Sequence, residues 1–120
     1  MHDFRNLHVW ERAVDLAVRV HAITRRISPV VAPGLRNQLC RAAASIPANI
    51  AEGARQETSA QTARFLSYAI GSTSEVESHL ELARRLSPQA TEAQATIDEL
   101  IEIRRMLCAL RSYHKRKAGG

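Results

Sequence analysis

Residues 9–27, VWERAVDLAVRVHAITRRI, carry apolar residues alternately four and three positions apart. The repeating residues are Val9, Ala13, Leu16, Val20, Ile23 and Ile27. This spacing is typical of a helix with one apolar seam. Trp10, Val14 and Ala17 widen the seam, as expected for a helix that is buried on more than one side. The stretch therefore predicts a helix over about 7–27 that packs against other helices.

Three further segments have the same periodicity, and short breaks separate them. The second, over about 35–53, aligns Leu35, Leu39, Ala42, Ile46 and Ile50. The third, over about 59–86, aligns Leu66, Ala69, Thr73, Val76, Leu80 and Ala83. The fourth, over about 91–114, aligns Ile97, Leu100, Ile103, Leu107, Leu110 and Tyr113. The second is expected to stop at Gly53, a residue type common just after a helix. The basic tail 115–120 has no apolar anchor and is expected to fray.

The helix lengths and the short breaks together predict the fold class. Long helices joined by short connections pack side by side in opposite directions. The chain of 120 residues is therefore expected to form one domain, 1–120, an all-α, antiparallel up-down-up-down four-helix bundle. Pro47 lacks an N–H group, and its ring clashes with the carbonyl group of Ala43. We therefore expect the second helix to kink or restart at Pro47.

Several sequence features bear on where the protein acts. The first residues, MHDFRNLHVWERA, are charged and do not resemble a signal peptide. No apolar run approaches the roughly 20 residues that span a bilayer. Cys40 and Cys108 are isolated, and we expect two reduced, packed thiols, although the sequence does not tell whether they are close together. These features predict a soluble cytoplasmic protein.

Sequence patterns for catalysis and metal binding were sought next. Di-iron bundles need Glu-x-x-His pairs, and none of the histidines has a glutamate three residues before it. Glu75 and His79 share a helix face, which more often makes a surface pair than a metal site. There is no glycine-rich phosphate loop and no nucleophile motif. We therefore expect no enzyme activity and no catalytic, cofactor-binding or metal-binding residues.

The basic residues are the main pointer to a partner. The formal net charge is +5, and all basic residues except Lys115 and Lys117 are arginine, which suits contacts with phosphate or carboxylate. The candidate nucleic-acid contacts are Arg25, Arg26, Arg84, Arg85, Arg104, Arg105, Arg111, Lys115, Arg116 and Lys117. Cations near helix ends also complement the helix dipole, and these groups would lie at both ends of a bundle. A solvated charged surface is therefore the competing interpretation, unless assembly repeats a weak patch around an axis.

The stretch 45–53, SIPANIAEG, places polar residues in an apolar run. Four polar residues fall along one side of the second helix, namely Arg41, Ser45, Asn49 and Glu52. Buried polar groups must be paired. We therefore expect these four residues to form a hydrogen-bond network that reaches Ser72 or Glu75 on the third helix.

The same stretch belongs to a wider pattern that resembles a known family. The pattern comprises Phe4-Arg5-Asn6-Leu7, Val9-Trp10, Gly34-Leu35, Gln38-Leu39, Arg41-Ala42-Ala43, the whole of 45–53, Arg55, Phe65-Leu66, Ala69, Gly71-Ser72, Glu75 and Glu77. It is similar to the bacterial 23S rRNA-intervening-sequence proteins, also called four helix bundle proteins. The chain departs from that pattern at Val30-Val31-Ala32, where members commonly carry acidic residues.

The resemblance implies a four-helix bundle that assembles as a homopentamer and has no known enzymatic activity. Some members are encoded inside insertions in ribosomal RNA genes. A protein similar in fold, the accessory variability determinant of diversity-generating retroelements, forms a basic pentamer that works with a reverse transcriptase and nucleic acid. The first helix agrees with assembly, because its apolar residues cover more than one face.

The sequence thus leads to one functional hypothesis and two competitors. The first is a non-enzymatic oligomeric scaffold that binds RNA, DNA or a nucleoprotein partner through basic surfaces. The alternative is a purely protein-interacting or self-assembling module whose charge serves solubility. A third, a metalloenzyme, would require bound metal in the purified protein.

Overall fold

The computed structural model describes residues 3–88 and 90–119, and every regular element in these residues is helical. A short 3-10 helix, η1 (Phe4–Asn6), precedes α1 (His8–Thr24). The other helices are α2 (Leu35–Ala54), α3 (Ser59–Leu86) and α4 (Ala93–Gly119). The prediction of an all-α protein with four long helices is confirmed.

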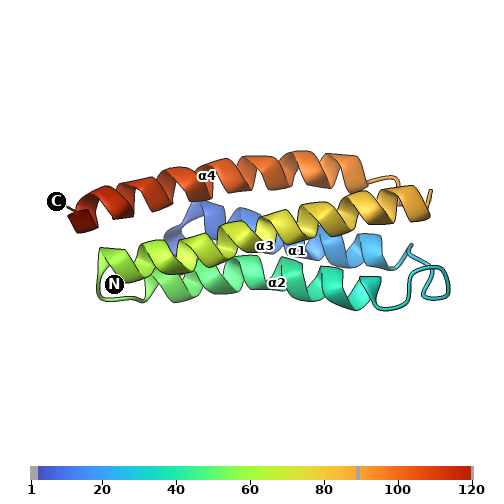
Figure 1. Cartoon of the computed structure of the whole chain (residues 1–120), viewed down its shortest axis with the longest axis horizontal. Coiled ribbons are helices and arrows are strands. Elements are labelled where there is room, and N and C mark those ends of the chain that lie inside the picture. Colours follow the sequence, from blue (N-terminus) through green and yellow to red (C-terminus); the bar gives the residue numbers. More distant parts are fainter. Residues whose placement is uncertain (1–2, 89, 120) are drawn as a thin grey trace.

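The four long helices lie side by side along an elongated body of 51 × 21 × 18 Å (Figure 1). Helix α1 packs against α2 and α4, and α3 packs against the same two helices. The connections that follow α1 and α3 lie at one end of the body, which we call the α1–α2 end (Figure 1). The connection between α2 and α3 lies at the other end, which we call the α2–α3 end, and α4 finishes there (Figure 1).

The apolar seams predicted from the sequence form the core. Every seam residue of the first helix is at most 5% exposed, as expected when a 3.6-residue period keeps one face inward. Leu16, Ile46, Leu80 and Leu100 are fully buried, and together with similar residues they join all four helices in one cluster. Burial of such side chains contributes about 1.5–3 kcal/mol each, so this core is the main source of stability.

Buried hydroxyl groups within the core are satisfied locally. Thr73 donates to the carbonyl oxygen of Ile70 at 2.6 Å, and Thr96 donates to that of Glu92 at 2.9 Å. Such bonds along one helix let a polar side chain sit in an apolar layer without losing its hydrogen bond. Thr73 therefore occupies a seam position without breaking the core.

Helix α2 is continuous through Pro47, with no break in its helical assignment. The Ser45 hydroxyl donates to the carbonyl oxygen of Ala42 at 2.7 Å, and the Asn49 amide donates to that of Ser45 at 2.8 Å. Both bonds reach backbone carbonyl groups in the turn before the proline, where one helical hydrogen bond is missing. The predicted kink stays a prediction.

Gly53 corrects one expectation. It lies inside α2, which ends at Ala54, and among the glycines described only Gly34 has a positive φ, of 82°. A Cβ atom at residue 53 would lie 3.1 Å from Cβ of Phe65 and 3.4 Å from the carbonyl oxygen of Thr62. The missing side chain therefore serves the close approach of α2 and α3 and not a left-handed turn.

The end of α4 differs from the sequence prediction as well. Residues 115–119 continue the helix instead of forming a frayed tail. Lysine, arginine and alanine favour the helical state, and cations in the last turn complement the helix dipole. Local propensity therefore outweighs the missing apolar anchor in this segment.

Candidate nucleic-acid interface

Two of the basic residues at the α1–α2 end, Arg84 and Arg85, are engaged by a glutamate. Arg84 and Arg85 both pair with Glu81, at 2.5 and 3.1 Å. The hydrogen bond from Arg84, and next the one from Arg85, lowers the pKa of the Glu81 carboxyl below its ordinary value. Arg26 hydrogen-bonds to the Thr91 hydroxyl at 3.5 Å. This end therefore offers fewer free cations than its sequence suggests.

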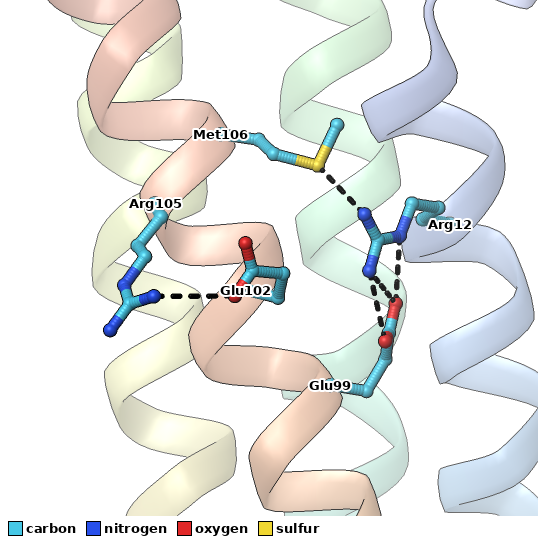
Figure 2. A network of polar contacts seen from close by, with 5 residues as sticks. All are labelled: Arg12, Glu99, Glu102, Arg105 and Met106. Atoms are coloured by element: carbon cyan, nitrogen blue, oxygen red, sulfur yellow. Dashed lines mark hydrogen bonds and ion pairs between the residues drawn. The ribbon is translucent and has the colours of Figure 1, made fainter.

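Two predicted contacts in the middle of α4 are also paired. Arg104 bonds to Glu77 of α3 at 2.7 Å. Arg105 lies 3.5 Å from Glu102 (Figure 2). Arg104 is half-buried, so its pair ties α3 to α4. An incoming phosphate group would have to displace these carboxylates.

The α2–α3 end has a different balance of charge. Arg64 of α3 and Lys115 of α4 line a shallow cavity of about 310 Å³, together with Ser67. Arg111 donates to the Ser67 hydroxyl at 3.3 Å. We call this set of Arg64, Ser67, Arg111 and Lys115 the α3–α4 groove. None of its three cations pairs with a carboxylate in the part of the chain that the structure describes.

Tyr68 accompanies one of these cations, Arg64, and Tyr113 accompanies Lys117 on another side of α4. Arg64 Nε donates to the Tyr68 hydroxyl at 2.7 Å, and its guanidinium lies 5.9 Å from the ring centre. Tyr113 is 49% exposed, and Lys117 Nζ lies 6.0 Å from its ring centre. Exposed rings beside cations supply stacking surfaces next to phosphate-binding groups. Cations and rings of this kind suit a flexible polyanion with planar bases.

Sequence reasoning named Arg111, Lys115, Arg116 and Lys117 at this end but missed Arg64, Ser67 and Tyr68. The spacing of Arg64 and Tyr68, four residues apart on one helix, was a signal available in the sequence. Ser67 and Arg111 are distant in sequence, and they meet because α3 and α4 pack together. The predicted Arg25, at the other end, makes no ion pair among the described residues.

The polar residues around 45–53 divide into two groups. Ser45 and Ser72 hydrogen-bond across α2 and α3 at 2.6 Å. The side chains of Arg41 and Glu52 are exposed and make no hydrogen bond or ion pair within residues 3–88 and 90–119. Glu75 is also exposed and lies 3.5 Å from His79, with which it pairs when the imidazole is protonated. Of the predicted network, the hydrogen bond that joins α2 to α3 is the one between Ser45 and Ser72.

A contact that the sequence did not suggest joins α1 to α4. Arg12 donates to both carboxylate oxygens of Glu99, at 2.8 and 3.0 Å, and a third N–H group points at the Met106 sulfur at 3.2 Å (Figure 2). The hydrogen bond to Glu99 raises the pKa of the Arg12 guanidinium, so the guanidinium stays charged at any physiological pH. This two-point contact fixes the register of α1 against α4.

Residues 3–88 and 90–119 contain no group of three or more His, Cys, Asp or Glu side chains placed to hold a metal ion. None of the helices described combines the length and apolar character needed to cross a membrane.

Glu81 makes a testable contribution to the pH dependence of stability. Its pKa is lower in the folded state than in the unfolded state, so the contribution is present above the unfolded pKa and is lost as pH falls through the folded pKa. We expect the melting temperature of Glu81→Gln to be lower than that of the parent at pH 7 and closer to it at pH 3. Calorimetry at several pH values measures the difference. A constant difference from pH 7 to pH 3 would contradict the assignment.

No curated protein matches the chain. A family model described as 23S rRNA-intervening sequence protein matches residues 5–109, which run from η1 into α4 and cover most of the chain. The chain belongs to the 23S rRNA-intervening sequence protein family.

Proposed function

We propose that this protein is a non-enzymatic, oligomeric bundle that binds single-stranded RNA or DNA through the α3–α4 groove. The observation that carries the proposal is the set of three cations in that groove, Arg64, Arg111 and Lys115, which have no carboxylate partner among the described residues. The formal charge of +5 supports it by favouring encounter with a polyanion.

The pairing of Arg84 and Arg85 is why we place binding in the groove and not at these two arginines of the α1–α2 end, where Arg25 and Arg36 have no carboxylate partner among the described residues. Arg84 and Arg85 share Glu81, so a phosphate group would gain little there after displacing the carboxylate. In the groove, a phosphate meets cations and the Ser67 hydroxyl without displacing an ion pair. Neutralised phosphates release counterions, and this release drives binding.

Tyr68 favours a single strand over a duplex. It hydrogen-bonds to Arg64 of the groove and is 45% exposed, so it offers part of its ring to a base. Stacking contributes about 1–3 kcal/mol per base and requires bases that are not already stacked in a helix. In a duplex, the bases are held inside, and only the phosphates would reach the groove.

Assembly is the second part of the proposal. The outer side of α1 carries Trp10, Val14 and Val18, and Val18 is 65% exposed. A homopentamer that covers this side would remove the apolar surface from water and repeat the groove around an axis. Repetition converts a weak site into a stronger one through effective concentration.

The proposal also covers the helix topology, the location and the relatives of the protein. We propose an up-down-up-down topology, which is supported by α3–α4 contacts in opposite order, from Glu77–Arg104 to Ser67–Arg111. We also propose a kink in α2 at Pro47 and a cytoplasmic location in a bacterium. We further propose a relation to the accessory variability determinant of diversity-generating retroelements. The basic charge supports that relation.

A second candidate function is a protein-interacting or self-assembling module without affinity for nucleic acid. The Glu81 pairs with Arg84 and Arg85 favour it, because charges that are already paired serve solubility and need no anionic partner. Both candidates predict an oligomer, so the binding measurement separates them.

The test compares two double variants of equal charge change. Arg111→Gln/Lys115→Gln removes two cations from the groove, and Arg84→Gln/Arg85→Gln removes two from the α1–α2 end. We expect the parent to bind a single-stranded RNA or DNA oligonucleotide at low salt. Arg111→Gln/Lys115→Gln should reduce the slope of the logarithm of the binding constant against the logarithm of the salt concentration by about 1–2. Arg84→Gln/Arg85→Gln should reduce that slope by less than about 0.5.

Light scattering on the same samples gives the oligomeric mass. Equal losses in the two variants would place binding outside the groove. A stable oligomer of the parent without salt-dependent binding would favour the second candidate. A monomeric mass would overturn the proposed assembly.

A further inference from the structure

Cys40 of α2 lies beside His21 of α1. The thiol Sγ atom is 3.5 Å from Nδ1 of the imidazole, a hydrogen-bonding distance for sulfur. The cysteine is half-buried and the histidine is exposed, so the pair sits at the surface and not in the core. This contact was not anticipated from the sequence, because nineteen residues separate the two positions.

The pair opens into a cavity of about 390 Å³ at the α1–α2 end. Arg36 and Asn37, from the first turn of α2, line the same cavity. The left-handed backbone of Gly34 turns the connection into α2, so that this connection contributes to the wall. The volume lies within the range of small-molecule sites.

Thr24 is a second polar neighbour of the Cys40 sulfur. Its hydroxyl donates to the carbonyl oxygen of His21 at 2.6 Å and lies 3.7 Å from Sγ of Cys40. Because the threonine proton is used in the first bond, Oγ1 faces the sulfur with a lone pair. The imidazole and Oγ1 are therefore the two groups to which the thiol can donate its proton.

We propose that Cys40 and His21 form a reactive-thiol site that exchanges with small anionic disulfides. The Sγ atom attacks one sulfur of the disulfide, and a new S–S bond forms as the old one breaks. The leaving sulfur departs with the electron pair as a thiolate. The Cys40 proton passes to Nδ1 of His21, in the tautomer where that nitrogen is unprotonated.

Arg36 gives the site its preference for anions. Its guanidinium lines the cavity and makes no ion pair among the residues that the structure describes. A carboxylate on the disulfide would meet this cation, while the Asn37 amide offers a further donor. A neutral disulfide gains nothing from the charge of Arg36.

Cys108 of α4 provides a control within the same chain. It is half-buried like Cys40, but it makes no hydrogen bond in the described residues. The two thiols therefore differ in their neighbours more than in their exposure. A difference in their reactivity reports the contribution of His21 and Arg36.

The experiment uses full-length single-thiol variants, Cys108→Ser and Cys40→Ser, with dithiobis(nitrobenzoate) as the anionic disulfide and dithiodipyridine as the neutral one. We expect Cys40 to react with the anionic reagent at least about tenfold faster than Cys108. In the Cys108→Ser background, His21→Gln should slow both reagents, and Arg36→Gln should slow the anionic reagent alone. Circular dichroism checks that each variant keeps its helices.

Three outcomes would overturn the proposal. If Cys40 reacts no faster than Cys108, Cys40 is not a reactive thiol. The rate could be unchanged in His21→Gln, which would remove the proton acceptor. Arg36→Gln could slow both reagents equally, which would remove the preference for anions.

Discussion

Replacing Ile46 with alanine is expected to lower the free energy of unfolding by about 3 kcal/mol. Ile46 is fully buried in the middle of α2 and belongs to the core cluster that joins the four helices. The substitution removes three carbon atoms from that cluster, and the loss combines their transfer free energy with the cost of the cavity left behind. Urea denaturation followed by circular dichroism measures the change.

Val30→Ala is the matched control. Val30 is 86% exposed, so its replacement by alanine should change the free energy of unfolding by less than about 0.5 kcal/mol. Both variants are measured at one protein concentration, because assembly would couple stability to concentration. Similar small effects in Ile46→Ala and Val30→Ala would contradict the assigned core.

The apolar seams could be predicted from the sequence because burial follows the helical period. Val9, Leu16 and Val20 lie on one face whatever the partner helices are, and all three are buried. The start of α3 could also be predicted, since Thr58 caps it by accepting a hydrogen bond from the backbone N–H group of Gln61. The helical period and the N-cap both depend on residues close together in the sequence, so neither depends on how the helices are arranged.

The ion pairs between helices could not be predicted in the same way. Arg12 and Glu99 meet only because of the rotation and register of α1 against α4, which no local spacing encodes. The same reason explains the α3–α4 groove, where Ser67 meets Arg111. Arg41 does not join the network because its own side chain is exposed, although Ser45, one turn further along the same side of α2, contacts Ser72. The local sequence pattern therefore does not determine which residues of different helices come into contact.

Replacing Gly53 with valine is expected to lower the free energy of unfolding by about 2 kcal/mol. The first added carbon atom would lie 3.1 Å from Cβ of Phe65, and the two further methyl groups would press on α3. The carbonyl oxygen of Gly53 also accepts a hydrogen bond from the Thr62 hydroxyl at 2.8 Å, and separation of the helices would weaken it. Helix propensity favours valine over glycine by only about 0.5 kcal/mol, so overpacking decides the sign.

The same substitution at Gly71 separates packing from propensity. A Cβ atom at residue 71 meets no heavy atom within 4 Å, although this glycine also lies inside a helix, α3. Gly71→Val should therefore be neutral or raise the free energy of unfolding by a few tenths of a kcal/mol, to about 0.5 kcal/mol. Urea denaturation of both variants gives the comparison. Destabilisation of equal size at residues 53 and 71 would mean that valine itself is the cause. Changes of opposite sign in the free energy of unfolding would mean that α2 and α3 approach so closely at Gly53 that only a residue without a side chain fits.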